Sequence, residues 1–220
     1  MDAVRATLHR KQRQTFRQSQ GFFNIAHGSV RSGKTFVLEM RRWVDHVRRT
    51  PQGDLLMAGR TLKALERNVL RPLQDWLGPD RFSYSLGNKT ATLLGRRIEL
   101  EGANDVQAEA KIRGMTLAGA LLNEVTLYPE GFVREVINRS SGDGAAIFAT
   151  TNPDSPYHYL KSDFIDREAE LAAQGFDLRV WHYTLDDNPA LSPAYVAAIK
   201  ASHTGLWHKR FVLGLWVQAA

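Results

Sequence analysis

The sequence contains no cysteine among its 220 residues. This absence excludes disulfide bonds and metal sites built on thiolates, and it is typical of proteins that work in a reducing compartment. No apolar run approaches the roughly 18 residues that a membrane-spanning helix needs, and the polar, arginine-rich start lacks the apolar segment of a secretory signal. The 7 histidines are scattered without the spacing of a zinc site. We therefore expect no membrane association, no disulfide and no zinc.

The composition narrows the class of protein without identifying a function. Hydrophobic residues make up 43% of the chain, which is enough for one substantial core and argues against disorder. Lysine and arginine outnumber aspartate and glutamate by 29 to 23, so the net charge is +6. This charge is compatible with a polyanionic partner but does not by itself require one. Since the sequence has neither internal repeats nor a low-complexity linker, a single domain is the simpler interpretation.

The most informative segment is GSVRSGKT at residues 28–35, which fits the pattern G-x-x-x-x-G-K-[ST]. An apolar run at 22–26 precedes it and a helix-compatible stretch at 36–49 follows, so a plain glycine-rich hairpin or helix cap explains it less well. Such a loop directs main-chain N–H groups at phosphate, places Lys34 on the β and γ oxygens, and offers the Thr35 hydroxyl to Mg²⁺. The sequence predicts binding of a nucleoside triphosphate with Mg²⁺. The expected ligands are Gly28, Ser29, Val30, Arg31, Ser32, Gly33, Lys34 and Thr35.

Apolar runs alternate with amphipathic stretches along the rest of the chain. Runs that are apolar on both faces indicate parallel strands covered on both sides, and the 3.6-residue periodicity between them indicates helices. We therefore expect an α/β fold of the P-loop NTPase class (ASCE/RecA-like), with a mainly parallel sheet sandwiched by helices and a small β insertion at 82–100. Strands are expected at 22–27, 55–59, 117–122 and 145–149, and helices at 2–20, 36–49, 62–77, 130–139, 157–174, 193–202 and 205–213.

A strand that ends in polar residues beside such a loop can supply the water-activating group of an ATPase. The small and apolar run 118–122 ends in Asn123 and Glu124, and no other segment has this shape. Glu124 is the candidate to orient and polarise the attacking water, although a strand-terminal glutamate taken alone is more often structural. Asn123 could hold Mg²⁺ through a bound water, but it lacks the negative charge of the usual aspartate. We expect weaker metal affinity, a compensating carboxylate elsewhere, or lost hydrolysis.

A third strand with a polar end is expected at residues 147–153, which read IFATTNP. Thr150, Thr151 and Asn152 could contact the γ-phosphate or the attacking water and transmit hydrolysis to the rest of the fold. The alternative is ordinary turn chemistry, because Thr-Asn-Pro-Asp favours a turn in any protein.

Taken in order, these segments resemble the ATPase domain of the large terminase subunit, the DNA-packaging motor of tailed bacteriophages. The resemblance covers almost the whole chain. Lys11-Gln12 is similar to the family's adenine-recognition motif, LLNE at 121–124 to its hydrophobic-Asp-Glu motif except at Asn123, ATTNP at 149–153 to its coupling motif, and Asp-Asn-Pro at 187–189 to a segment before the last helices. The resemblance implies that the nucleotide is ATP and that Gln12 contacts the adenine.

Two arginines gain a role from this resemblance. Arg31, inside the loop, is expected to touch the γ-phosphate of its own subunit's ATP. Arg113 precedes the strand that ends in Asn123 and Glu124, and it is expected to reach the ATP of a neighbouring subunit. A guanidinium suits both roles because it stays charged and forks around phosphate oxygens. Without the resemblance, either arginine would be assigned to a surface salt bridge or a DNA phosphate contact.

The resemblance also implies how the chain is organised. Residues 1–220 are expected to form one P-loop ATPase domain, with an adenine-motif helix at 1–20, a core at 21–187 and a C-terminal helical segment at 188–220. Two-metal nucleases need several acidic ligands together, and no aspartate or glutamate follows Asp187. We therefore expect no nuclease domain and no DNA cleavage by this chain.

The implied function is ATP hydrolysis that powers translocation of double-stranded DNA into a procapsid, in the host cytoplasm at the portal. The expected partners are the DNA, the portal protein and the small terminase subunit, with a ring of subunits on the portal and a chain that can be monomeric when isolated. Two alternatives stay open. The chain could be another DNA-dependent P-loop ATPase such as a helicase, or a nucleotide-binding module whose hydrolysis is impaired by Asn123.

Overall fold

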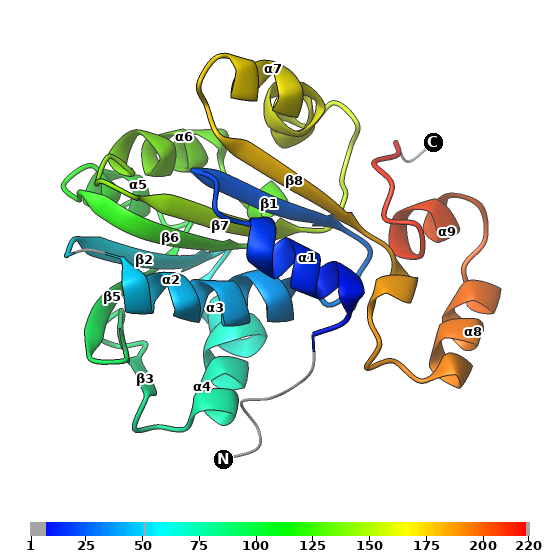
Figure 1. The fold of residues 1–220 in the computed structure, drawn as a ribbon, viewed down its shortest axis with the longest axis horizontal. Helices are drawn as coiled ribbons and strands as arrows, with labels where there is room; N and C mark the ends of the chain where they lie inside the picture. The colour runs from blue at the N-terminus through cyan, green and yellow to red at the C-terminus, as the bar shows by residue number, and fades with distance from the viewer. Residues whose placement is uncertain (1–7, 51, 219–220) are drawn as a thin grey trace.

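The computed structural model describes residues 8–50 and 52–218, so the predicted helical residues 2–7 lie outside the described residues. Within that part, eight strands form one sheet in the order β3-β4-β5-β2-β6-β7-β1-β8 (Figure 1). The strands are β1 Phe23–Gly28, β2 Asp54–Gly59, β3 Phe82–Ser85, β4 Thr90–Leu93, β5 Arg96–Gly102, β6 Leu117–Asn123, β7 Ala146–Thr151 and β8 Leu178–Tyr183.

Most of this sheet is parallel. The neighbours β5-β2-β6-β7-β1-β8 all run the same way, and β3 and β4 add an antiparallel hairpin at one edge. All residues of β1, β6 and β7 are buried, as expected for central strands covered on both faces. The register places Thr150 of β7 beside Ala26 of β1 and beside Asn123 of β6. The polar carboxyl ends of these three neighbouring strands therefore lie side by side. The predicted mainly parallel α/β sheet with a β insertion is confirmed.

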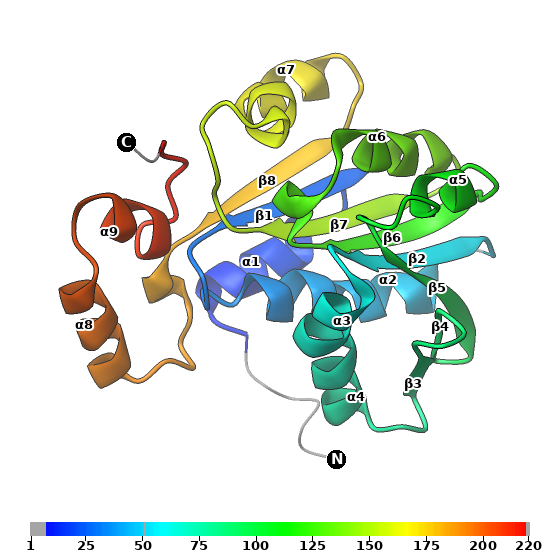
Figure 2. The ribbon, with the colours of Figure 1, turned by 180° about the vertical axis from the view of Figure 1, so that it is seen from behind.

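Helices cover both faces of the sheet (Figures 1 and 2). Helices α1, α2, α3 and α4 lie on one face, α5, α6 and α7 lie on the other, and α8 and α9 lie beyond the carboxyl end of β8. In the described part of the chain, no helix is long and apolar enough to cross a membrane. The helical elements are α1 Arg10–Gln18, η2 Thr35–Arg42, α2 Trp43–Arg49, α3 Leu62–Leu65, η3 Glu66–Leu70, α4 Arg71–Leu77, α5 Ala108–Ile112, η4 Val125–Leu127, α6 Glu130–Arg139, η5 Leu160–Phe164, η6 Ile165–Arg167, α7 Glu168–Ala173, η7 Leu185–Asp187, α8 Pro193–Ser202 and α9 Gly205–Phe211.

Several elements differ from the sequence prediction. Strand β8 and helix α5 were not predicted, and the predicted helix 157–174 begins only at Leu160 and changes geometry twice before Ala173. The middle residues of β8 are only half buried because β8 is an edge strand, so its pattern lacks the apolar run that marks the central strands. Helix α5 has five residues, too few to show a helical period, and it packs against α6.

The segment after α9 packs against the carboxyl ends of β1 and β8. At Gly214 (φ 67°), an added Cβ would lie 2.5 Å from the Ser29 nitrogen and 2.7 Å from the Gly28 Cα. The Trp216 indole Nε1 donates to His27 Nδ1 at 3.1 Å, and His182 Nε2 lies 2.8 Å from the Leu213 carbonyl oxygen. The C-terminal segment therefore touches the chain where β1 passes into the loop at 28–35.

Burial changes the titration of the histidine in this contact. His27 is 8% exposed, and its burial lowers its pKa to about 3, with a further contribution from His182 at a ring-centroid distance of 5.1 Å. Only the neutral imidazole can accept the hydrogen bond from Trp216 at Nδ1. The folded protein therefore resists protonation of His27, whereas the unfolded chain takes up a proton near the ordinary histidine pKa of 6.5.

We predict that Gly214→Ala destabilises the fold more than Gly205→Ala does. Both glycines have positive φ, but an added Cβ at Gly205 meets open space. Backbone strain should cost about 1–2 kcal/mol at either position, and steric overlap should add about 1–3 kcal/mol at Gly214. Urea unfolding of the two variants measures the difference. Equal free energies of unfolding would show that the C-terminal segment does not pack on the loop.

We also predict that His27→Gln reduces the acid sensitivity of the fold. Because the folded pKa lies below the unfolded value, the His27 contribution is fully present above pH 6.5 and is lost as the pH falls toward 3, with a slope of up to about 1.4 kcal/mol per pH unit. The free energy of unfolding, measured at several pH values from 7 to 4.5, should fall less steeply in the variant. His46, whose pKa is also lowered by burial, contributes to both proteins and cancels in the comparison. Parallel pH profiles would contradict the assignment.

Candidate nucleotide-binding and hydrolysis site

Residues 28–35, called the phosphate loop from here on, connect β1 to the helix that starts at Thr35. The backbone takes positive φ at Gly28 (137°), Arg31 (54°) and Gly33 (89°). Glycine adopts such angles freely, and an added Cβ at Gly33 would in any case lie 2.6 Å from Gln12 Nε2 of α1. The loop therefore makes the tight, glycine-dependent bend that its sequence predicts.

The ammonium group of Lys34 is buried inside this bend. Its Nζ donates to the carbonyl oxygens of Gly28 (3.1 Å) and Ser29 (2.7 Å) and to Asn152 Oδ1 (3.0 Å), and Ser32 Oγ lies 3.4 Å away. Burial lowers the pKa of Lys34 to about 8. These oxygens compensate the buried positive charge of the ammonium group.

A cavity of about 450 Å³ opens beside the loop at the ends of β6 and β7. We call it the strand-end cavity. Glu124 enters it with φ 59° and ψ 52°, a left-handed conformation that is uncommon for glutamate. Such strain persists only where the surrounding structure enforces it, and it is often found at functional sites. The residues that line the cavity are Val30, Arg31, Lys34, Thr35, Asn68, Asn123, Glu124, Thr150, Thr151 and Asn152.

The side chain of Asn123 is fixed by hydrogen bonds with one residue on each of two helices. Its Nδ2 donates to Glu39 Oε2 at 2.8 Å, and its Oδ1 accepts from Asn68 Nδ2 at 3.0 Å. Glu39 is fully buried, and its other carboxyl oxygen accepts from the Thr150 hydroxyl. Burial raises the pKa of Glu39 to about 8, against the opposing effect of the hydrogen bonds from Thr150 and Asn123. The compensating carboxylate expected from the sequence therefore has a candidate in Glu39.

The oxygen atoms at this end of the cavity are of the kind that suits a hard divalent cation. Thr35 and Asn123, the predicted Mg²⁺ residues, both line it. Over residues 8–50 and 52–218, no group of three or more histidine, cysteine, aspartate or glutamate side chains could hold a metal alone. A bound Mg²⁺ would therefore depend on phosphate oxygens and waters in addition to these side chains, which is usual for Mg²⁺ at phosphate sites.

The three predicted coupling residues connect the loop to the segment after β6. Asn152 contacts Lys34, and Thr150 contacts Glu39. The hydroxyls of Thr151 and Thr126 lie 2.6 Å apart, next to the strained Glu124. Hydrogen bonds therefore join Lys34, Glu39 and Thr126 to the carboxyl end of β7 and the residue that follows it.

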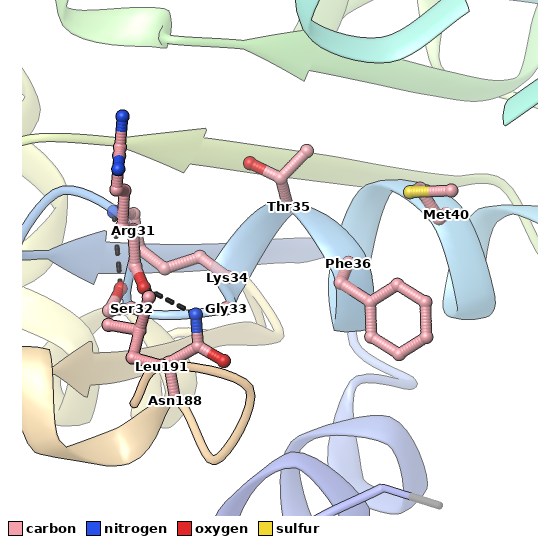
Figure 3. A pocket seen from close by; sticks show the side chains of 9 residues that line it. All are labelled: Arg31, Ser32, Gly33, Lys34, Thr35, Phe36, Met40, Asn188 and Leu191. Atoms are coloured by element: carbon pink, nitrogen blue, oxygen red, sulfur yellow. Dashed lines mark hydrogen bonds between the residues drawn. The ribbon is translucent and has the colours of Figure 1, made fainter. Parts of the chain in front are cut away.

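A second cavity of about 400 Å³ lies on the other side of the loop (Figure 3). We call it the helix-side cavity. Phe36, Met40 and Leu191 give it an apolar wall, and Figure 3 shows the Asn188 amide donating to the Arg31 carbonyl, at 2.6 Å. An apolar wall beside a phosphate-binding loop suits the base and sugar of a nucleotide. The remaining lining residues are Arg31, Ser32, Gly33, Lys34 and Thr35.

Gln12, the predicted adenine residue, packs against the loop without lining either cavity. Its Oε1 accepts from the His9 backbone nitrogen at 3.0 Å, which caps α1. The neighbouring Lys11 forms an ion pair with Asp187 at 2.6 Å, so the predicted adenine motif does contact the predicted 187–189 segment. Contact between Gln12 and adenine stays a prediction.

The two predicted arginines are placed very differently. Arg31 lines both cavities, and its guanidinium donates to the Tyr195 hydroxyl of α8 at 3.1 Å. Arg113 follows α5 and precedes the amino end of β6. The phosphate loop lies at the carboxyl ends of the parallel strands, so Arg113 lies toward the opposite end of the sheet. Its side chain is 60% exposed and pairs with Glu109. Arg113 therefore does not act in the site of its own chain, and its role toward a neighbouring subunit stays a prediction.

Sequence reasoning missed Glu39 and Asn68. Glu39 lies between the buried residues Leu38 and Met40, and an acidic residue on the buried face of a helix is itself a signal of a polar partner in the core. Asn68 gives no comparable signal, because its helix is amphipathic and its contact with Asn123 spans 55 residues.

No protein-family model and no curated protein matches this chain. Among solved structures, the large terminase of a thermophilic bacteriophage matches with 30% identity and a TM-score of 0.80 over 96% of this chain. The same terminase in complex with ATP-γ-S matches with 31% identity, a TM-score of 0.79 and 96% coverage. The chain covers 54% and 53% of those two terminase chains, so it spans about half of their length.

A second terminase matches in fold alone. The large terminase ATPase domain of Thermus phage P74-26 aligns with a TM-score of 0.65 at 12% identity, and the match covers 98% of this chain and 96% of that domain. Together with the loop and the order of the motifs, these matches confirm the predicted fold class and the predicted resemblance. Over almost its whole length, the chain is similar to the P-loop ATPase domain of bacteriophage large terminases.

Proposed function

We propose that this chain binds ATP with Mg²⁺ and hydrolyses it. The observation that carries the proposal is the strand-end cavity, which Glu124 shares with Lys34 and Thr35 of the phosphate loop. The large terminase of the thermophilic bacteriophage has been solved with ADP and with ATP-γ-S, which supports nucleotide binding by the same fold. A carboxylate and a phosphate loop on one cavity are the two parts that water attack on a γ-phosphate needs.

Lys34, Glu124 and Arg31 have different roles in the proposed hydrolysis. Lys34 exchanges its contacts within the loop for β- and γ-phosphate oxygens and neutralises the charge that develops on them. Glu124 orients a water molecule in line with the γ-phosphate and accepts its proton. Arg31, which lines both cavities, adds a second positive charge near the phosphates. Mg²⁺, when bound, supplies further charge neutralisation at the phosphate oxygens.

We predict that Glu124→Gln lowers ATP turnover by about 10²- to 10⁴-fold, because the amide orients water but cannot accept its proton. Its affinity for ATP-γ-S should stay within about threefold of the wild type. Lys34→Ala should lose turnover and should also bind ATP-γ-S about ten- to a hundredfold more weakly, because a charge-assisted contact to phosphate is gone. Phosphate release and nucleotide binding are measured on the same preparations.

The matched control is Glu170→Gln, which makes the same change on the exposed surface of α7. It should leave both measurements unchanged. If wild-type turnover is no higher than that of Glu124→Gln while nucleotide still binds, the hydrolytic proposal fails. The nucleotide-binding module suggested by Asn123 is then the better description.

We further propose that hydrolysis drives translocation of double-stranded DNA into a procapsid, in the host cytoplasm at the portal. The support is the resemblance to large terminases, of which this chain spans about half. The portal protein and the small terminase subunit are proposed as partners, in a ring in which Arg113 could approach the ATP of the next subunit. The net charge of +6 is favourable for electrostatic binding to the phosphate backbone of DNA.

We predict that duplex DNA raises ATP turnover more than single-stranded DNA of equal length does, and that no strands are separated. Because such contacts release counterions, the affinity for duplex DNA should fall at least about tenfold between roughly 50 and 200 mM salt. Turnover and fluorescence-based strand separation are measured side by side. Strand separation coupled to turnover would identify a helicase and overturn the packaging proposal.

A further inference from the structure

Glu39 is a buried carboxyl group that the mechanism above does not use. It lies on η2, five residues after Lys34, and its side chain is fully buried. One carboxyl oxygen accepts from Asn123 Nδ2 at 2.8 Å, and the other accepts from the Thr150 hydroxyl. Glu39 therefore joins the ends of β6 and β7 from behind the strand-end cavity without lining it.

This contact decides how the Asn123 amide is turned. Both oxygens of Glu39 accept hydrogen bonds in the structure, one from Thr150 and the other from Asn123, so the Nδ2 of Asn123 faces Glu39. Its Oδ1 then faces the other way, where Asn68 Nδ2 donates to it at 3.0 Å and where the strand-end cavity lies. An amide oxygen has two lone pairs, so one remains for a ligand in the cavity.

The same contact determines what an aspartate at residue 123 would meet. In an aspartate, the atom that replaces Nδ2 would be a carboxylate oxygen, 2.8 Å from the Glu39 oxygen. Two carboxylates at that distance in a buried site repel each other strongly, and one of them must take up a proton or move. Asparagine removes this repulsion and replaces it with a hydrogen bond.

We propose that Glu39 and Asn123 are an exchanged pair: the carboxylate that such ATPases carry at the strand end lies on the helix behind it, and Asn123 presents an oxygen to the cavity in its place. Glu39 is then a positioning residue that holds Asn123 in the required orientation and, in its ionised form, supplies negative charge behind the cation position. The inference rests on the proposed Mg²⁺-nucleotide site and deepens it, because it identifies where the charge missing from Asn123 is found.

A purely structural role for Glu39 makes a different prediction. If Glu39 only ties β6 and β7 together, changes at residues 39 and 123 damage the same contact, and an aspartate at 123 gains nothing from a glutamine at 39. In an exchanged pair, the carboxylate can occupy either position but not both. The double variant Glu39→Gln/Asn123→Asp returns one carboxylate and one amide to the pair, with the positions reversed.

The experiment compares the wild type, the two single variants Glu39→Gln and Asn123→Asp, the double variant and the control Glu170→Gln. Two quantities that do not depend on turnover are measured at about pH 8.5, above the Glu39 pKa of about 8. They are the thermal unfolding midpoint and the ratio of ATP-γ-S dissociation constants without and with Mg²⁺. Asn123→Asp should lower the midpoint by roughly 5 °C or more, and the double variant should recover at least half of that loss. Glu39→Gln should reduce the Mg²⁺ ratio by about tenfold, and the double variant should restore it.

Restoration of the midpoint and of the Mg²⁺ ratio in the double variant supports the exchanged pair, even where a single variant fails to fold. Additive losses, or a double variant that is no better than the worse single variant, overturn it. Turnover is assayed separately. If the double variant restores both quantities and the wild type binds nucleotide but releases no phosphate, the proposed hydrolysis is contradicted and the exchanged pair stands. If the wild type turns over ATP normally but the losses of the single variants add in the double variant, the exchanged pair is contradicted and the proposed hydrolysis stands.

Discussion

The hydrogen bonds of the Lys34 ammonium hold the site together. An ammonium group has three protons, and four oxygen atoms lie within 3.4 Å of it, three from the phosphate loop and one from Asn152 after β7. A buried charge is tolerated only because these oxygens surround it. A phosphate oxygen that reaches Lys34 must displace at least one of them. Asn152 is the only one of the four outside the loop, so a change in the contacts of Lys34 would reach the end of β7 through it.

The strain at Glu124 depends on packing that is equally local. A left-handed non-glycine residue costs roughly 1–2 kcal/mol, so neighbouring contacts must enforce it. The Tyr128 hydroxyl lies 2.6 Å from the Ala58 carbonyl oxygen and 2.9 Å from that of Asn123, and it ties the turn after β6 to β2. The Thr126–Thr151 contact ties the same turn to β7. Glu124 is therefore held between a contact to β2 and a contact to β7. This fixed position agrees with the proposed role of Glu124 in orienting a water molecule.

The sequence predicts the parts of this site that are continuous along the chain. The phosphate loop, Glu124 and Thr150 each stand at the end of an apolar run, so the topology of a parallel sheet is enough to bring them to one edge. Contacts between side chains of helices and side chains of strands leave no comparable pattern in the sequence. Asn68 meets Asn123 across 55 residues and Glu39 meets it across 84, and neither pairing follows from periodicity. The edge strand β8 was missed for a related reason, because half-buried residues blur its pattern.

Asn123, which replaces the usual aspartate at the end of the strand, shows why a motif cannot be judged from the sequence alone. Considered along the sequence, an asparagine at the strand end is a lost charge. In three dimensions, it is the neutral member of a pair whose other member is a carboxyl group 2.8 Å away on the helix that follows Lys34. The electrostatics of a metal position depend on the distance of each charge, not on the element that carries it. A strand-end motif therefore has to be assessed together with the residues packed against it, which here are Glu39 of η2 and Asn68 of η3.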